Sequence, residues 1–160
     1  MTSGYLKDIA DLRPRNARLM GLDVGAKTIG IALCDPAQSL ATPLQTIQRT
    51  KFTKDIKLLA EIVADYEVEG FVIGLPLHMN DSEGCRAQSV KDFVLELLRY
   101  PEVVGAQPWV AFWDERLSTV SAENLVDGSV SKRKAKASGV IDKLAACIIL
   151  QSALDYIGNL

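Results

Sequence analysis

Hydrophobic and polar positions along this chain alternate in blocks that predict a mixed α/β domain. The stretch 19–35 (LMGLDVGAKTIGIALCD) predicts two strands joined by a tight turn, because small residues and a glycine occupy the reversal. A third strand is predicted over 39–49, where Pro43 favours the edge of the sheet. The continuous apolar runs at 70–75 and 109–113 predict buried parallel strands.

Helical periodicity predicts three longer helices between and after these strands. The first begins at Thr53, with apolar residues on one face and charged residues on the other. Its predicted buried stripe is Ile56, Leu59, Ala60 and Val63, and its predicted outer face is Lys54, Asp55, Lys57 and Glu61. The second spans about 85–100 and ends at Pro101, and a short helix through Val126 is predicted to begin at Ser118 or Thr119. The last spans about 140–156, with Ile141, Leu144, Ala145, Ile148 and Ser152 predicted on one side.

This order of elements, three strands followed by βαβ units, predicts a ribonuclease-H-like mixed β-sheet flanked by helices on both faces. Residues 1–18 carry charges of both signs and are predicted to form an N-terminal arm. Residues 19–160 are predicted to form a single domain, because no linker or repeat divides them.

Composition narrows the class of protein. The 160 residues are 48% hydrophobic and 24% charged, with a formal net charge of −2, which excludes a uniformly basic nucleic-acid coat but allows a local basic patch. Three widely spaced cysteines without CxxC spacing indicate reduced thiols. Neither a secretory signal nor a run long enough for a membrane span is present, so we expect a cytoplasmic protein.

Asp23 is the unusual residue of the first predicted strand, because it interrupts an apolar run. Removing a carboxylate from water costs several kcal/mol unless it is paired or bound to a metal. Asp23 could cap a backbone N–H near the turn. It could also be a metal ligand in a ribonuclease-H-like sheet, or flank a phosphate-binding hairpin of the actin and sugar-kinase type. The chain is about half the length that a two-lobed kinase needs, which weakens the last alternative.

Other acids lie where apolar elements end. Asp114 and Glu115 follow a buried strand, the position at which open α/β sheets place ligands, and Asp142 begins the last helix. Converging carboxylates repel one another and are stable as ligands of hard cations such as Mg²⁺ or Mn²⁺. Each acid also has a simpler interpretation. Glu115 could pair with Arg116 or Arg86, and Asp142 could complement the helix dipole. Strand geometry sends Asp114 and Glu115 to opposite faces and does not say which faces the site.

Four sequence blocks carry a resemblance to a known family. They are GLDVGAKTIGIALCD (21–35), GLPLHMNDSEG (74–84), DERLSTVSAE (114–123) and IDKLAACIILQSALD (141–155). In this order and spacing the chain resembles the YqgF/RuvX family, described as Holliday junction resolvases and as pre-16S rRNA nucleases. The resemblance covers about residues 19–157 and implies that the acidic triad is Asp23, Glu115 and Asp142. Asp114 stays a possible further ligand, because strand geometry does not choose between it and Glu115. Thr28 stands where the family pattern has Arg, Cys34 where it has a small residue such as Ser, His78 where it has Asn, and Asn80-Asp81 where it has Asp-Gly.

The resemblance implies a metal-dependent endonuclease that acts on structured nucleic acid, with Mg²⁺ or Mn²⁺ as cofactor. The 5′ end of precursor 16S rRNA is the favoured substrate. A four-way DNA junction is the alternative, and it would call for a two-fold homodimer rather than a monomer. A non-catalytic nucleic-acid-binding module is a third interpretation. The basic residues expected to contact phosphates are Lys27, Arg86, Arg116, Lys132, Arg133, Lys134 and Lys136. The last four also fit a solvated surface loop.

Overall fold

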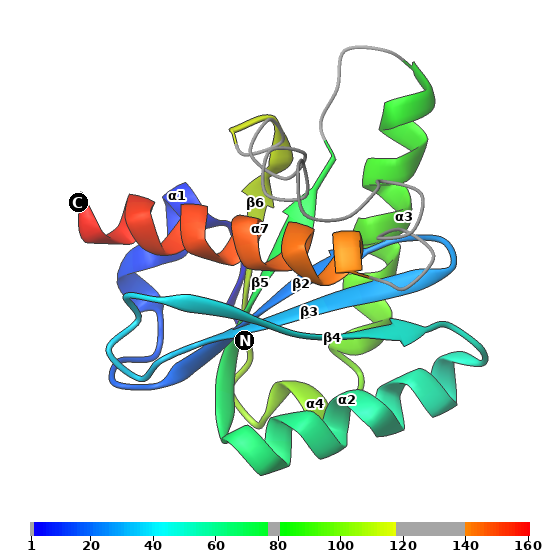
Figure 1. The fold of residues 1–160 in the computed structure, drawn as a ribbon, viewed down its shortest axis with the longest axis horizontal. Helices are drawn as coiled ribbons and strands as arrows, with labels where there is room; N and C mark the ends of the chain where they lie inside the picture. Colours follow the sequence, from blue (N-terminus) through cyan, green and yellow to red (C-terminus); the bar gives the residue numbers. More distant parts are fainter. Residues whose placement is uncertain (1, 77–80, 118–139) are drawn as a thin grey trace.

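The computed structural model describes residues 2–76, 81–117 and 140–160, apart from the side chains of 81–84. Its strands form one six-stranded sheet in the order β1-β6-β5-β2-β3-β4 (Figure 1). The strands are β1 (Thr2–Tyr5), β2 (Arg18–Val24), β3 (Thr28–Cys34), β4 (Ala41–Gln48), β5 (Val68–Leu75) and β6 (Trp109–Asp114). The helices are α1 (Leu6–Ile9), α2 (Phe52–Tyr66), α3 (Asp81–Leu97), α4 (Pro101–Val104) and α7 (Val140–Gly158), with 3-10 turns η1 (Ala10–Leu12) and η2 (Glu115–Leu117).

The predicted sheet is confirmed in its centre. β2 and β3 form the antiparallel hairpin, closed by a hydrogen bond of 2.8 Å from the Gly25 N–H to the Thr28 carbonyl. β5 lies parallel to β2 on one side and to β6 on the other, as expected of buried βαβ strands. β4, which contains Pro43, is an edge strand as its proline predicted.

The N-terminal residues belong to the sheet, which the sequence did not indicate. β1 pairs in parallel with β6 and forms the second edge. The following turns pack against the same strand, and the Trp109 indole N–H donates a hydrogen bond of 3.0 Å to the Ile9 carbonyl. The expectation of a separate arm over residues 1–18 therefore missed a strand, whose partner lies more than a hundred residues further along the chain.

Two hydrophobic clusters lie on opposite faces of the sheet. One joins α2, α3 and α4 to side chains such as Phe71 and Ile73 of β5. The other joins α1 and α7 to the opposite face, with Val72 of the same strand. Figure 1 shows α7 crossing one side of the sheet while α2 and α4 lie on the other. The prediction of helices on both faces is confirmed.

The buried face of α7 differs from the predicted one. Its buried residues are Ala146, Ile149, Leu150, Ala153, Leu154 and Ile157. The five residues predicted to share the inner side, from Ile141 to Ser152, are only partly buried. The helix has apolar residues on nearly every side, so periodicity alone does not identify its inner face.

Two glycines in the sheet lie directly beneath α7 and allow the helix to approach closely. A Cβ atom built on Gly21 would lie 2.7 Å from Leu150 Cβ and 2.9 Å from the Ala146 carbonyl oxygen. A Cβ on Gly30 would overlap the backbone carbonyl of Asp142. These strands therefore contact α7 closely, and only residues without a side chain allow that approach.

Asp55 was predicted to lie on the outer face of α2 but is 1% exposed. Its carboxylate accepts a hydrogen bond of 3.2 Å from the Thr50 N–H and lies 4.0 Å from Arg49 Nε. These partners precede the helix in the chain, so a count of helical faces does not reveal them. They compensate the cost of burying the charge.

Two further expectations concern cysteines and membranes. Cys34, Cys85 and Cys147 are free, as their spacing predicted. Within the described ranges, no helix combines the length and the apolar character that crossing a membrane requires.

We predict that Gly30→Ala lowers the free energy of unfolding by at least the roughly 1–3 kcal/mol typical of overpacking, because the added methyl group meets backbone. Gly158→Ala is the matched control, since a Cβ at that end of α7 meets nothing within 4 Å. Chemical denaturation followed by circular dichroism measures both. Equal stability of the two variants would contradict the close contact between β3 and α7.

Candidate active site

Asp23 lies near the end of β2 and faces α7. It pairs across the hairpin with Gly30, the glycine beneath the Asp142 backbone carbonyl. Paired residues of neighbouring strands share a face of the sheet, so Asp23 lies beside the first turn of α7. On the other side of β2, Leu22 pairs with Ile73, and Gly74 follows in β5. The carboxylate thus has a glycine on each neighbouring strand.

Glu115 enters the space above Gly74. It is the first residue of η2, directly after β6, and a Cβ on Gly74 would lie 2.6 Å from Glu115 Oε1. The Asp23 and Glu115 carboxyl groups are hydrogen-bonded to each other. Two carboxyl groups form such a bond only when one of them carries a proton, because a carboxylate has no donor.

The electrostatics of Asp23 follow from this crowding. Burial is the largest cause that raises the pKa of Asp23, and the charges of Glu115 and Asp142 raise it further, to about 7. Arg86 acts in the opposite direction as the nearby cation. A carboxylic acid whose pKa is raised by two other carboxylates is typical of functional sites.

Asp142 occupies the first turn of α7, as predicted. That position complements the helix dipole, which is the simpler interpretation of the residue. The charge of Asp142 also raises the pKa of Asp23. The backbone carbonyl of Asp142 lies directly against Gly30 of β3, so the first turn of α7 is close to the sheet. The structure therefore brings Asp23, Glu115 and Asp142 to one place from three separate segments.

Asp114 holds Arg116 through a bidentate ion pair. Arg116 donates to Asp114 through Nε, at 3.0 Å to Oδ1, and through Nη2, at 2.7 Å to Oδ2. Its backbone N–H also donates to Asp114 Oδ1 at 3.0 Å. Arg116 thus pairs with Asp114, and this bidentate pair raises the pKa of Arg116. Strand alternation does not separate the two acids, because β6 ends at Asp114 and Glu115 begins a 3-10 turn.

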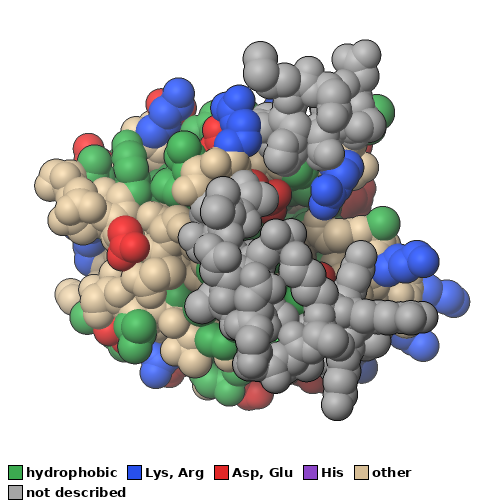
Figure 2. Space-filling view, turned by 45° about the horizontal axis from the view of Figure 1, so that its top comes forward, with side chains coloured by type: hydrophobic (Ala, Val, Ile, Leu, Met, Phe, Trp, Pro, Cys, Tyr) green, Lys and Arg blue, Asp and Glu red, His purple; other side chains and the backbone are tan. Residues whose placement is uncertain are grey.

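The basic residues predicted from sequence lie at different places. Arg86 extends from α3 and is close enough to act on Asp23. Lys27 is exposed at the hairpin turn, where its backbone carbonyl accepts a hydrogen bond of 2.8 Å from the Arg49 N–H. His78 and the basic group of Lys132, Arg133, Lys134 and Lys136 lie outside the described residues, as does the short helix expected through Val126. Figure 2 shows Lys and Arg side chains interspersed with Asp and Glu side chains over this face of the described part of the molecule.

The donor set suits a hard divalent cation in its chemistry, since all three groups offer carboxylate oxygens. As they lie, the described side chains contain no group of three Asp, Glu, His or Cys residues that could hold a metal ion. Asp23 and Glu115 are joined by a hydrogen bond, and Asp142 reaches Asp23 only through its charge. The carboxylates are thus gathered, but they do not form a ready-made three-ligand cage.

Sequence reasoning missed the glycines that form this site. Gly30 and Gly74 lie within predicted strands, where a glycine often marks the close approach of another segment. That signal was present in the sequence and would have predicted the close approach of another segment, which the structure identifies as α7 at Gly30 and η2 at Gly74. The sequence likewise contained no indication of the role of Arg49, whose Nη1 donates a hydrogen bond of 2.6 Å to the Gly25 carbonyl.

We predict that Asp23→Asn stabilises the metal-free protein at neutral and alkaline pH. Below the ordinary pKa of 3.8, Asp23 is protonated in both the folded and the unfolded state and makes no difference. Between that value and the folded pKa of about 7, only the folded state holds the proton, so wild-type stability falls as pH rises. Relative to wild type, the free energy of unfolding of the variant should be higher by at most about 4 kcal/mol above pH 7 and unchanged near pH 3.

Urea unfolding of both proteins at several pH values in EDTA measures this difference. A variant that is less stable than wild type at pH 8 would show that Asp23 is structural.

Comparisons with known proteins agree with this arrangement. A family model described as "RuvX: Holliday junction resolvase" matches residues 17–156. A protein of Rhodospirillum centenum is 51% identical over 142 residues, covering 89% of this chain and 75% of its own length. One of Phenylobacterium zucineum is 43% identical over 155 residues, covering 97% of each chain. Both are named "Putative pre-16S rRNA nuclease".

The fold is also similar to that of a solved resolvase structure. The structure of T. thermophilus RuvC in complex with Holliday junction substrate matches with a TM-score of 0.53 and 14% identity, covering 89% of this chain and 96% of that one. At this identity the likeness shows the fold alone, which is the predicted ribonuclease-H-like plan. The family match spans both sheet faces and all three gathered acids. The chain belongs to the RuvX family, a nuclease family whose members hydrolyse phosphodiester bonds.

Proposed function

We propose that this protein is a metal-dependent endonuclease that uses Asp23, Glu115 and Asp142. The observation that carries the proposal is the convergence of these carboxyl groups, with the pKa of Asp23 raised to about 7 by burial and by the other two. Such a cluster is costly for an isolated protein and is favourable around a hard cation. Family membership adds the class of reaction.

The acids and Arg86 would have different roles in the proposed reaction. Bound Mg²⁺ or Mn²⁺ would supply an activated water and stabilise the leaving oxygen. Asp23 and Glu115 would act as ligands after losing the proton that they share, and Asp142 would complete the set from α7. Arg86, the cation beside Asp23, would bind the phosphate and fix the nucleic-acid backbone without reading its sequence.

Precursor 16S rRNA is the substrate that the curated relatives favour, since their names specify it. In a bacterial cell this reaction takes place in the cytoplasm, the location expected for this protein from its sequence. A four-way DNA junction is the second candidate, favoured by the description of the family model. Cleavage of both junction strands would call for a two-fold dimer, whereas an rRNA end needs one protomer.

One experiment tests the activity and the substrate together. Purified protein is incubated with Mg²⁺ or Mn²⁺ and, in parallel, with a precursor 16S rRNA fragment and a four-way DNA junction. We expect cleavage of the RNA, its loss in EDTA, and its loss in Asp23→Asn. Selective cleavage of the junction would favour the second candidate, and cleavage of neither would contradict the proposal.

Metal titration separates the nuclease from a non-catalytic binding module. Isothermal titration with Mn²⁺ should show a site that Asp23→Asn removes. A binding module predicts no such site, although it would still bind RNA. Heat released equally by both proteins would place the metal away from Asp23.

We predict that Glu115→Gln is more damaging than Asp114→Asn. Glu115 is hydrogen-bonded to Asp23, whereas Asp114 acts through Arg116. Losing a supporting group of this kind costs about 10–100-fold in activity or metal affinity, and losing a direct ligand costs more. Cleavage rates across a Mn²⁺ series measure both, and extra metal should partly rescue only Asp114→Asn. The reverse order would mean that Asp114 is the ligand.

A further inference from the structure

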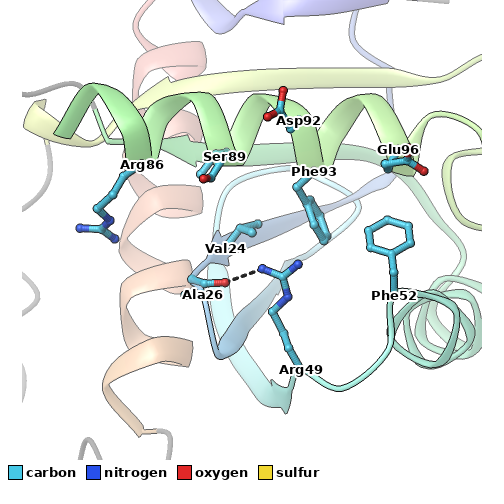
Figure 3. A pocket seen from close by; sticks show the side chains of 11 residues that line it. Val24, Ala26, Arg49, Phe52, Arg86, Ser89, Asp92, Phe93 and Glu96 are labelled. Atoms are coloured by element: carbon cyan, nitrogen blue, oxygen red, sulfur yellow. Dashed lines mark hydrogen bonds between the residues drawn. The ribbon is translucent and has the colours of Figure 1, made fainter. Parts of the chain in front are cut away.

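A cleft of about 420 Å³ opens beside the candidate active site, on the other face of the hairpin. It lies between the β2–β3 turn, the beginning of α2 and the side of α3 that faces them (Figure 3). Two of its lining residues relate the cleft to Asp23. Val24 is the next residue in the chain, and the positive charge of Arg86 acts on the Asp23 carboxyl group. Its volume is in the range of small-molecule sites.

Aromatic rings and one guanidinium group form the inner wall of the cleft. The rings of Phe52 and Phe93 have centroids 5.6 Å apart at an interplanar angle of 70°. The guanidinium carbon of Arg49 lies 5.3 Å from the Phe93 ring centroid. In Figure 3, Arg49 extends between the hairpin turn and Phe52, toward Phe93. Aromatic rings and arginine planes are the surfaces on which unpaired nucleobases stack.

Arg49 is held in place before any ligand arrives. It donates to the Gly25 carbonyl at 2.6 Å and lies 4.0 Å from the buried Asp55 carboxylate. Its side chain nevertheless remains 26% exposed. A planar group that is fixed on both edges and still accessible makes a preorganised platform, which loses little entropy when a ring stacks on it.

The polar rim of the cleft favours a base over a phosphate. Ser89, Asp92 and Glu96 line it from α3. Asp92 accepts a hydrogen bond of 2.9 Å from Gln88, and Glu96 lies 3.6 Å from Arg99, so neither carboxylate is committed to a ligand of the cleft. Their negative charge at the rim disfavours a phosphate at that end of the cleft, whereas an uncharged base avoids this repulsion. Arg86, at the end of the cleft nearest Asp23, is the group suited to the neighbouring phosphate.

We propose that this cleft binds one unpaired nucleobase of the substrate strand, adjacent to the phosphate that is cleaved. The inference rests on the proposed nuclease function and adds to it that the substrate is single-stranded next to the cut. A fully paired strand could not place a base there. The site would require bases to be splayed out, as single-stranded RNA allows.

Binding of abasic oligonucleotides tests this inference. Fluorescence anisotropy is measured in an Asp23→Asn background with an eight-nucleotide RNA and with a series that carries one abasic nucleotide at each position in turn. We expect about 5- to 150-fold weaker binding at one or two positions, the range that stacking one base provides. The same series in DNA shows whether the sugar matters.

Two variants and one control locate the effect. Ser89→Phe fills the cleft from an exposed helix position, and Phe52→Leu removes one ring. Either change should bring the ratio of abasic to intact dissociation constants to about 1. Leu95→Phe is the matched control, because Leu95 is 64% exposed on α3 and outside the cleft. Its ratio should equal that of the background protein. Circular dichroism confirms that each variant is folded.

The outcomes separate this inference from the proposed function. Cleavage of RNA by the protein with Asp23 intact, together with binding that is indifferent to every abasic position, would overturn the cleft and leave the nuclease. Base-dependent binding without cleavage would overturn the nuclease and leave the cleft. An equal loss in Leu95→Phe would assign the effect to α3 as a whole and overturn the cleft, and failure of every oligonucleotide to bind would also overturn the cleft, while the cleavage assay decides the nuclease separately.

Discussion

The close contact between α7 and the sheet is the constraint on which the site depends. The backbone of Asp142 rests where a side chain on Gly30 would be, so the first turn of α7 lies directly against β3. Further along, Gln151 accepts a hydrogen bond of 2.8 Å from the Ala41 N–H and donates one of 3.1 Å to the Ser39 carbonyl. These bonds join the helix to the beginning of the edge strand β4. The packing fixes the distance of α7 from the sheet, and the polar contacts fix its position along the sheet. Asp142, in the first turn of α7, is placed beside Asp23 as a result.

Gathering acids in this way opposes folding, and the two hydrophobic clusters provide the compensation. The site lies at the end of β2, a central strand with α7 on one face and the cluster that includes Val24 on the other. Burial raises the pKa of Asp23 more than any single neighbouring charge does. The same apolar surroundings that stabilise the sheet therefore let Asp23 keep its proton up to about pH 7. A cation that neutralises the cluster would have to displace that proton, so metal binding and proton release are coupled.

Sequence reasoning succeeded where the signal is local and failed where it is not. The hairpin and the edge position of Pro43 follow from residues that are neighbours in the chain. β1 has four residues and needs β6 as a partner, so its own pattern does not reveal it. The buried charge of Asp55 depends on Arg49 and Thr50 before the helix. The convergence of the acids followed from strand ends and from family resemblance, whereas the glycines that permit it were visible in the sequence and were overlooked.

The interactions of Arg49 join the two halves of the proposed site. Asp55 is almost fully buried and lies 4.0 Å from Arg49, which in turn binds the Gly25 carbonyl at the hairpin turn. Gly25 is two residues from Asp23, so the group that would stack a base also holds the turn that follows the candidate metal ligand. A ring that stacked on this guanidinium in the proposed cleft would lie against a group that is hydrogen-bonded to the turn after Asp23. Because that turn joins β2 to β3, one hairpin carries both the candidate metal ligand and the partner of the proposed base platform. A strand without an unpaired base would lack the contact with the platform.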